Sequence, residues 1–301
     1  MHLNVVIVGC GDIGVRCAGT LQRAGHRVMG VRRNSGLLPD TIEARSADVC
    51  DPSSLKFLAD QPIDVLIYSL AAENFNESDY RAAYVDGVKN VLAALGDVSE
   101  AGAGAARLAL KRIFFISSTG VYHQNDGSVV DENSPTEPAR FNGQLMLEGE
   151  TLIRDTGIGT CIRFSGIYGP DRLRMINRVA AGQGSKEIST AYTNRIHVED
   201  CAAVIAHLVE CVQRGQTLEQ IYLASDCGPA TSTEVERFIA ETLGLVIEQS
   251  GSSASAAVNR IAGSKRCNNK RLLDSGYQFI YPDYRAGYAK IIEQLRSSSQ
   301  Q

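Results

Sequence analysis

The stretch that decides the fold of this chain reads Leu3-Asn4-Val5-Val6-Ile7-Val8-Gly9-Cys10-Gly11-Asp12-Ile13-Gly14. Residues 3–8 form a nearly continuous apolar, β-branched run, which is typical of a parallel strand buried on both faces. From Ile13 onward the apolar residues recur at helical spacing, and Gly25 is placed to end that helix. A second apolar run follows at residues 28–31. The pattern therefore predicts a strand, a glycine turn, a helix and a second strand.

The three glycines of this stretch have the Gly-x-Gly-x-x-Gly spacing of a dinucleotide-binding turn. One glycine permits a tight turn, one lets a pyrophosphate approach the backbone, and one lets the helix pack closely on the strand. The phosphates of such a ligand lie at the positive end of the helix. Because the motif follows a strand and opens a helix, we expect it to bind a dinucleotide, the alternative being a purely structural turn. The expected cofactor contacts here are Gly9, Gly11, Asp12, Ile13 and Gly14.

The end of the second strand indicates which dinucleotide binds. An NAD site usually has an acidic residue there, which bonds the ribose 2′-hydroxyl, but this chain has Arg32 and Arg33. Two guanidinium groups suit a 2′-phosphate, so the sequence predicts NADP(H). The alternative interpretation is that one or both arginines are solvated surface charges.

Composition limits the class of protein. The chain has 301 residues, of which 44% are hydrophobic and 21% charged, as is ordinary for a globular protein of one large or two unequal domains. Its net charge of −4 argues against nucleic acid and anionic membranes as partners. We find neither an apolar run of the ~20 residues that a membrane span needs nor the pattern of a signal peptide, so we expect a cytoplasmic protein.

The eight cysteines are scattered without a Cys-x-x-Cys pair. We therefore expect reduced core residues and no metal site. Cys10 lies inside the glycine turn, where it is either a redox-sensitive thiol at a helix N-terminus or a small filler of the core.

Strand and helix patterns alternate through the first half of the chain, which predicts an α/β fold with a doubly wound parallel (Rossmann) sheet. Thr231 and Glu234 fit a capping box that opens a helix. Further strands are expected at residues 64–72, 112–118, 160–164 and 221–224, and helices at 80–95, 143–155, 198–212 and 232–243. We expect 1–165 plus 196–225 to form the cofactor domain, and 166–195 plus 226–301 to form a smaller C-terminal substrate lobe.

Ligands of such a fold bind at the carboxyl ends of the strands. The strand expected at residues 64–72 ends in small residues that leave room for a cofactor, and the strand expected at residues 112–118 ends in hydroxyls. We therefore expect further cofactor contacts at Asp48, Val49, Leu70, Ala71, Ala72 and Ser117.

Several spaced motifs give the chain a wider resemblance. These are Gly9 to Gly14, Asp48-Val49, Ser117-Ser118-x-x-Val121-Tyr122, Asp131-Glu132, Arg163-Phe164-Ser165-Gly166-Ile167-Tyr168-Gly169-Pro170 and His197-Val198-Glu199-Asp200. Their order resembles that of the extended short-chain dehydrogenases/reductases, the group with the nucleotide-sugar epimerases and dehydratases. Phe141-Asn142-Gly143, Ser264 to Asn269 and Tyr281-Pro282 look like the YeeZ-like branch of atypical members.

The chain departs from this family at the catalytic pair. Family enzymes use a Tyr-x-x-x-Lys pair at the start of the helix that carries Glu150, and the family pattern places Asn142 and Met146 at those positions. Shifted alignments offer Phe141 with Leu145 or Arg140 with Gln144, so no register restores the pair. Neither Asn nor Met titrates near neutral pH, and a general acid/base contributes ~10²- to 10⁴-fold in rate.

The resemblance implies substitutes for this pair. Ser118 matches the catalytic serine or threonine of the family and can polarise a carbonyl. Tyr122 is a second catalytic candidate, with a buried packing role as the alternative, and Tyr168 and His123 are further ones. His197 matches a mainly structural position. For substrate we expect contacts at Thr119, Asn142, Tyr168 and Arg195, the last being either a phosphate or carboxylate ligand or a surface residue.

Two functions follow from these expectations. The first is an NADP(H)-dependent oxidoreductase, epimerase or dehydratase that acts on a small polar, sugar-nucleotide-like molecule. The second is a non-catalytic NADP(H)-binding sensor or scaffold, which the missing Tyr and Lys favour. Relatives often form dimers, so a homodimer is a further expectation.

Overall fold

The structure is a computed structural model that describes residues 2–96, 110–183, 189–245 and 264–298. The chain divides into two compact units. The first unit contains residues 1–121, 137–163 and 202–222, and the second contains 122–136, 164–201 and 223–301.

A seven-stranded sheet carries the fold, and its strand order is β11-β7-β5-β4-β1-β2-β3. The strands are β1 (Asn4–Val8), β2 (Arg27–Arg32), β3 (Glu43–Ser46), β4 (Val65–Tyr68), β5 (Arg112–Ser118), β7 (Gly159–Phe164) and β11 (Ile221–Ala224). All neighbouring pairs from β3 to β5 are parallel, and Val5 of β1 lies opposite Val28 on one side and Val65 on the other. The prediction of a doubly wound parallel sheet is confirmed.

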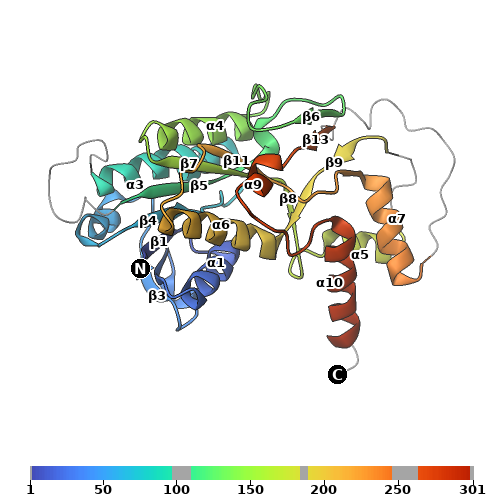
Figure 1. Cartoon of the computed structure of the whole chain (residues 1–301), viewed down its shortest axis with the longest axis horizontal. Coiled ribbons are helices and arrows are strands. Elements are labelled where there is room, and N and C mark those ends of the chain that lie inside the picture. Colours follow the sequence, from blue (N-terminus) through green and yellow to red (C-terminus); the bar gives the residue numbers. More distant parts are fainter. Residues whose placement is uncertain (1, 97–109, 184–188, 246–263, 299–301) are drawn as a thin grey trace. The chain divides into compact units, whose positions relative to one another are not determined.

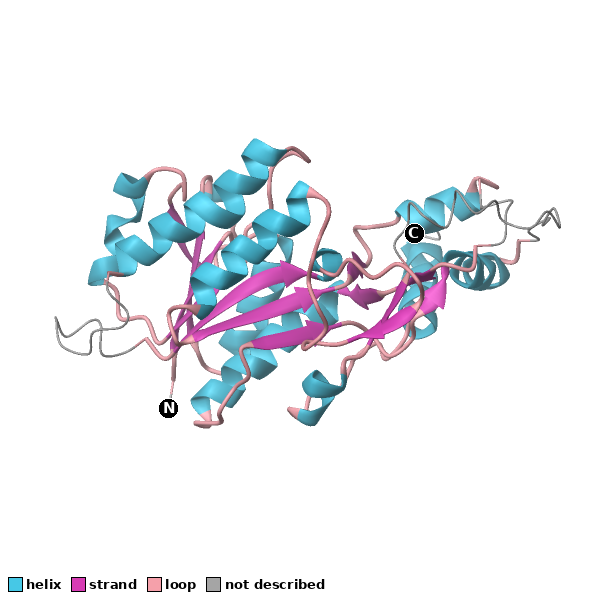
Figure 2. Cartoon of the chain, turned by 90° about the horizontal axis from the view of Figure 1, so that it is seen from above, coloured by secondary structure: helices cyan, strands magenta, loops and turns pink. Residues whose placement is uncertain are grey.

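Helices cover both faces of this sheet, with α3 and α4 on one face and α1 and α6 on the other (Figure 1, Figure 2). Their bounds are α1 (Asp12–Arg23), α3 (Gly87–Leu95), α4 (Phe141–Arg154) and α6 (Val198–Gln213). The central strands are buried on both faces, as their apolar sequences predict, and Ile7, Ile67 and Phe114 are fully buried.

The helix expected at residues 80–95 is interrupted. It consists of α2 (Glu77–Arg81), a π-helical turn η3 (Ala82–Asp86) and α3. The phenol of Tyr68 donates a 2.5 Å hydrogen bond to the carbonyl oxygen of Ala83, and a Cβ on Gly87 would lie 2.5 Å from that phenol. A side chain inserted into the helix in this way widens its turn.

Three short 3₁₀ segments also belong to the first unit: η1 (Ser35–Leu37), η2 (Pro52–Asp60) and η4 (Thr119–Val121). The second of these follows β3. Its residues Leu55 and Leu58 are buried, and the side chain of Asp51 caps its first turn by accepting from the Ser53 N–H.

The second unit is built from short two-stranded pieces and helices. β6 (Ser128–Val130) pairs with β13 (Lys265–Cys267), β8 (Gly166–Tyr168) with β10 (Arg195–His197), and β9 (Tyr192–Thr193) with β12 (Ala230–Thr231). Its helices are α5 (Arg174–Ala180), α7 (Ser232–Leu243), α9 (Lys270–Asp274) and α10 (Tyr284–Ser298). The capping box predicted at Thr231 and Glu234 is confirmed. Helices α5, α7 and α10 share an apolar core that includes Ile176, Ile239 and Ile291.

Within the described residues, no helix is long and apolar enough to cross a membrane.

Candidate functional site

The three glycines of the turn after β1 have three different surroundings. Gly9 has a φ of +79°, and a Cβ there would lie 2.7 Å from the backbone of Leu70. A Cβ on Gly14 would lie 3.2 Å from both Cys10 Sγ and Ile7 Cγ2, so this glycine lets α1 pack closely on β1. A Cβ on Gly11 would meet only the carbonyl oxygen of Gly9, at 3.9 Å. Gly11 therefore borders open space, as a backbone that a pyrophosphate approaches must do.

Helix α1 begins directly at this open glycine. Gly11 is its N-cap and supplies no side chain, and the first intrahelical bond runs from the Val15 N–H to the Gly11 carbonyl oxygen. The N–H groups of Asp12, Ile13 and Gly14 thus have no acceptor within the helix. Such groups, together with the helix dipole, bind phosphate. The turn fits a dinucleotide.

Cys10 fills the core beneath this turn. Its side chain is fully buried, and burial raises the pKa of its thiol to about 11. A thiol with so high a pKa is protonated at neutral pH and reacts slowly. The filler interpretation is therefore confirmed over the redox-sensitive one.

The two arginines at the end of β2, Arg32 and Arg33, differ in their partners. Arg33 Nη2 lies 3.0 Å from Glu73 Oε2, and both side chains are 65% exposed. This hydrogen bond raises the pKa of Arg33, as does the nearby charge of Asp48 to a smaller extent. In the part of the chain that the structure describes, no carboxylate forms an ion pair with Arg32. Glu73 has no motif that marks it in the sequence.

The other predicted cofactor residues line the same carboxyl edge of the sheet. Asp48 follows β3, and its Oδ1 accepts from the Cys50 N–H at 2.9 Å, while Val49 is buried. Leu70 packs against Gly9 just after β4, where the Ser69 N–H bonds the Val8 carbonyl oxygen and extends the ladder by one residue. Ala71 and Ala72 follow Leu70 directly.

Ser117 uses its hydroxyl inside the first unit. Its Oγ donates a 2.6 Å hydrogen bond to Glu150 Oε1, and Glu150 also accepts from Arg163 Nε at 2.9 Å and Nη2 at 2.6 Å. All three side chains are buried. The Ser117 side chain therefore anchors β5 to α4 and β7, and only its backbone remains for the predicted cofactor contact.

Ser118 and Asn142 lie beside the same glycine. Ser118 Oγ accepts from the Gly120 N–H at 3.0 Å, and it lies 3.3 Å from where a Cβ on Gly120 would stand. The Asn142 Nδ2 lies 3.8 Å from that same point, whereas its buried Oδ1 has no hydrogen-bond partner. Thr119, which separates Ser118 from Gly120 in the sequence, is buried. Met146, one turn after Asn142 in α4, is also buried. The structure thus brings two of the predicted site residues together at the end of β5.

An aromatic group that the sequence did not single out lies next to Asn142. Phe141 packs on Phe75 and Tyr80 with ring centroids 5.2 and 5.5 Å apart, and Phe75 and Tyr80 also lie 5.5 Å apart. Phe75 remains exposed. Of these three aromatic residues only Phe141 adjoins a predicted site residue in the sequence, so no pattern marks them as a group.

The remaining predicted residues belong to the second unit. The phenol of Tyr122 is buried and donates to the carbonyl oxygen of Asp131 at 2.8 Å, which favours its packing role. His123 is exposed. His197 is buried beneath Tyr281, with ring centroids 3.9 Å apart, so its assignment as a core histidine is confirmed.

Tyr168 and Arg195 take part in a buried polar group. Arg195 is only 6% exposed, so the interpretation of a surface residue is wrong. Its Nη2 donates to Thr193 Oγ1 at 2.6 Å, while its Nη1 and the phenol oxygen of Tyr168 are buried without a hydrogen-bond partner. Asp226, which sequence patterns missed, is 1% exposed nearby, and burial raises its pKa to about 7 although Arg195 lowers it.

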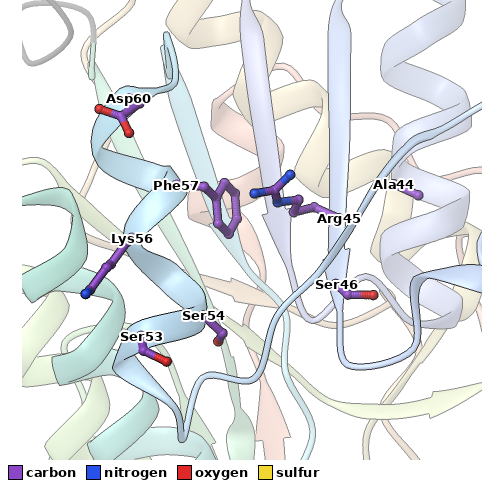
Figure 3. A pocket seen from close by; sticks show the side chains of 8 residues that line it. All are labelled: Ala44, Arg45, Ser46, Ser53, Ser54, Lys56, Phe57 and Asp60. Carbon is purple, nitrogen blue, oxygen red and sulfur yellow. The ribbon is translucent and has the colours of Figure 1, made fainter.

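A surface hollow of about 660 Å³ lies between β3 and η2 of the first unit (Figure 3). Ala44 to Ser46 line one side, and η2 residues including Phe57 line the other. The Arg45 guanidinium lies over the Phe57 ring, 4.9 Å from its centroid. None of the predicted site residues lines this hollow.

The chain matches the NAD dependent epimerase/dehydratase family over residues 5–224, and it belongs to that family. The match includes the glycine turn, the arginine pair and both Ser118 and Asn142. Among proteins of curated function, none matches this chain.

Solved structures agree with this assignment. A Methylobacillus flagellatus protein of the NAD-dependent epimerase/dehydratase type is 34% identical, with a TM-score of 0.82 over 98% of this chain and 100% of that one. The UDP-glucose 4-epimerase of Thermotoga maritima, solved with UDP-glucose, is 15% identical, with a TM-score of 0.76 over 99% and 100% of the two chains. The Bordetella bronchiseptica enzyme WbmG, solved with NAD and UDP, is 16% identical, with a TM-score of 0.76 over 99% and 96%. The last two similarities concern the fold alone.

Proposed function

We propose that this chain is an NADP(H)-dependent oxidoreductase of the epimerase/dehydratase type, acting on a small polar substrate such as a sugar nucleotide. The observation that carries the proposal is the pair of hydrogen-bonding side chains, Ser118 and Asn142, beside Gly120 in the unit that also holds the open glycine turn. The glycine turn follows β1, Ser118 is the last residue of β5 in the same sheet, and Asn142 lies in the first turn of α4.

Different residues of the first unit would bind different parts of the cofactor. The backbone at Gly11 and the start of α1 would hold the pyrophosphate, and Arg32 and Arg33 would hold the 2′-phosphate through charge-assisted hydrogen bonds. Bound NADP(H) would donate or accept the hydride.

The polar pair would hold the reacting oxygen of the substrate. Ser118 Oγ accepts from the Gly120 N–H, so its own proton is available for a substrate oxygen, and the Asn142 amide nitrogen is a second donor. Preorganised donors of this kind stabilise negative charge on oxygen.

We further propose that Asn142 and Met146 occupy the places of the family's Tyr and Lys. Because neither side chain titrates, the proton that balances hydride transfer would come from water or another group. Turnover would then be slower by the ~10²- to 10⁴-fold that a general acid/base contributes.

A screen of carbonyl substrates with NADPH tests this proposal. We expect slow NADPH oxidation with a subset of polar carbonyl compounds, and a Ser118→Ala variant that binds NADPH normally but loses that turnover. No turnover in the wild type with any compound, despite NADPH binding, would contradict the enzyme proposal.

The same result would support a second candidate, a non-catalytic NADP(H)-binding sensor or scaffold. Asn142 and Met146 favour this candidate, because they remove the titratable pair while the glycine turn keeps its geometry. Sustained hydride transfer with any metabolite would exclude it.

A further inference from the structure

One ion pair crosses the carboxyl edge of the sheet directly beside the glycine turn. Arg33 follows β2 and Glu73 follows β4, and these two strands are the neighbours of β1 on its opposite sides. Strands two places apart in a sheet are ~10 Å apart, a span that an arginine and a glutamate cover together. The 3.0 Å contact between Arg33 Nη2 and Glu73 Oε2 therefore passes across the end of β1, where the turn begins.

The contact engages one of the two arginines proposed to hold the 2′-phosphate. Arg33 has Glu73 as its hydrogen-bonded partner and Asp48 as a second nearby negative charge. Among the described residues, Arg32 has no such carboxylate partner. The two guanidinium groups thus differ in how freely they can accept a phosphate.

A 2′-phosphate and a 2′-hydroxyl respond differently to this arrangement. The phosphate carries close to two negative charges, so it competes with Glu73 for Arg33 and is repelled by the glutamate. The 2′-hydroxyl of NADH is uncharged, so it neither competes with Glu73 for Arg33 nor is repelled by the glutamate. Both side chains are 65% exposed, so the pair is weak enough in water to be exchanged on binding.

We infer that Glu73 is a specificity-determining residue, which limits the preference of this chain for NADPH over NADH by holding Arg33. The inference rests on the proposed NADP(H) site and adds to it a residue that opposes phosphate binding. Removing the charge of Glu73 releases Arg33 and removes the repulsion, and both effects strengthen binding of the phosphorylated cofactor only.

The test is a binding titration of NADPH and NADH, followed by cofactor fluorescence, on wild type and on Glu73→Gln. We expect NADPH to bind Glu73→Gln about threefold to tenfold more tightly and NADH to change less than about twofold. In an Arg33→Ala background the same glutamate change should strengthen NADPH binding less than it does in wild type, because only the repulsion between Glu73 and the 2′-phosphate is then removed.

Glu43→Gln is the matched control. Glu43 is an exposed residue of the first unit that lies opposite Met29, toward the start of β2, whereas Arg33 follows the end of that strand. Equal gains from Glu43→Gln and Glu73→Gln would show a general charge effect and overturn the inference. Wild type that prefers NADPH, with no change in Glu73→Gln, would overturn the inference and leave the proposed function standing. Wild type that binds neither cofactor would overturn both.

Discussion

The Ser118 hydroxyl oxygen and the Asn142 amide nitrogen lie 3.3 and 3.8 Å from the point that a Cβ on Gly120 would occupy. Two side chains that can donate hydrogen bonds therefore lie near the same glycine, just after the end of β5. Neither donor changes its charge near neutral pH. The pair can hold and polarise a substrate oxygen, but it cannot supply the proton that balances hydride transfer.

This arrangement predicts how Ser118 contributes to turnover. Ser118→Ala should lower kcat for NADPH-dependent carbonyl reduction about 10- to 100-fold, because one preorganised donor is lost, and leave the Kd for NADPH within about twofold. Ser118→Thr keeps the hydroxyl and should retain most of the activity. A Ser118→Ala variant with wild-type kcat would remove this residue from the reaction.

Two glycines of the turn should respond in opposite ways to alanine. Gly11→Ala places its methyl in open space, so the melting temperature should stay unchanged while NADPH binding weakens at least about tenfold. Gly9→Ala forces a side chain to a φ of +79° and within 2.7 Å of Leu70, so unfolding should become easier by about 2 kcal/mol or more. Thermal melts and fluorescence titrations separate the two effects. Wild-type NADPH binding by Gly11→Ala would argue against a phosphate at this turn.

The buried carboxylate of Glu150 should be a major determinant of stability. Glu150→Ala removes the carboxylate that pairs with the buried Arg163 guanidinium, which should lower the free energy of unfolding by about 3 kcal/mol in urea titrations. The control is Glu148→Ala on the same helix, whose exposed ion pairs with Arg81 and Lys89 contribute at most about 1 kcal/mol. Equal losses in the two variants would show that burial of the Glu150–Arg163 pair is not what matters.

Asp226 predicts a pH dependence of stability. Burial raises its pKa from 3.8 to about 7 in the folded state, so between these values the folded chain binds the proton that the unfolded chain has released. Its contribution to stability is therefore largest below pH 4 and is lost as the pH rises to 7. Asp226→Asn should remove this loss, which makes the variant more stable than wild type at pH 8 by on the order of 3 kcal/mol.

Urea titrations at pH 5 and pH 8 check this prediction, since the gap between Asp226→Asn and wild type should widen with pH. The charges that act on Asp226 are Arg195, which opposes the effect, and Asp283 and Asp200, which add to it. A constant gap would mean that Asp226 keeps an ordinary pKa in the folded chain.

Local patterns in the sequence were sufficient for the elements that carry the site. The apolar run, glycine turn and helical spacing of residues 3–31 correspond to β1, α1 and β2 within one or two residues at each end. The capping box at Thr231 also forms as predicted. These features depend on neighbours within a few positions, so the sequence displays them directly.

Features that depend on distant residues could not be predicted in this way. The π-helical turn at Ala82–Asp86 results from the phenol of Tyr68, which is far away in the sequence. The direction of the Ser117 hydroxyl depends on Glu150, and the partner of Arg33 is set by where the segment after β4 runs. Burial of Arg195 and Asp226 likewise arises from tertiary packing. The sequence could not predict it, because both residue types are mostly exposed in proteins.

The most direct test of the proposed NADP(H) site is a binding titration of NADPH and NADH against wild type and against the double variant Arg32→Ala with Arg33→Ala. We predict that wild type binds NADPH more tightly than NADH, and that the double variant loses most of the NADPH affinity while it keeps that for NADH. Equal binding of NADPH by both proteins would contradict the assignment of these arginines to the 2′-phosphate. Binding of neither nucleotide by the folded wild type would contradict the cofactor site itself.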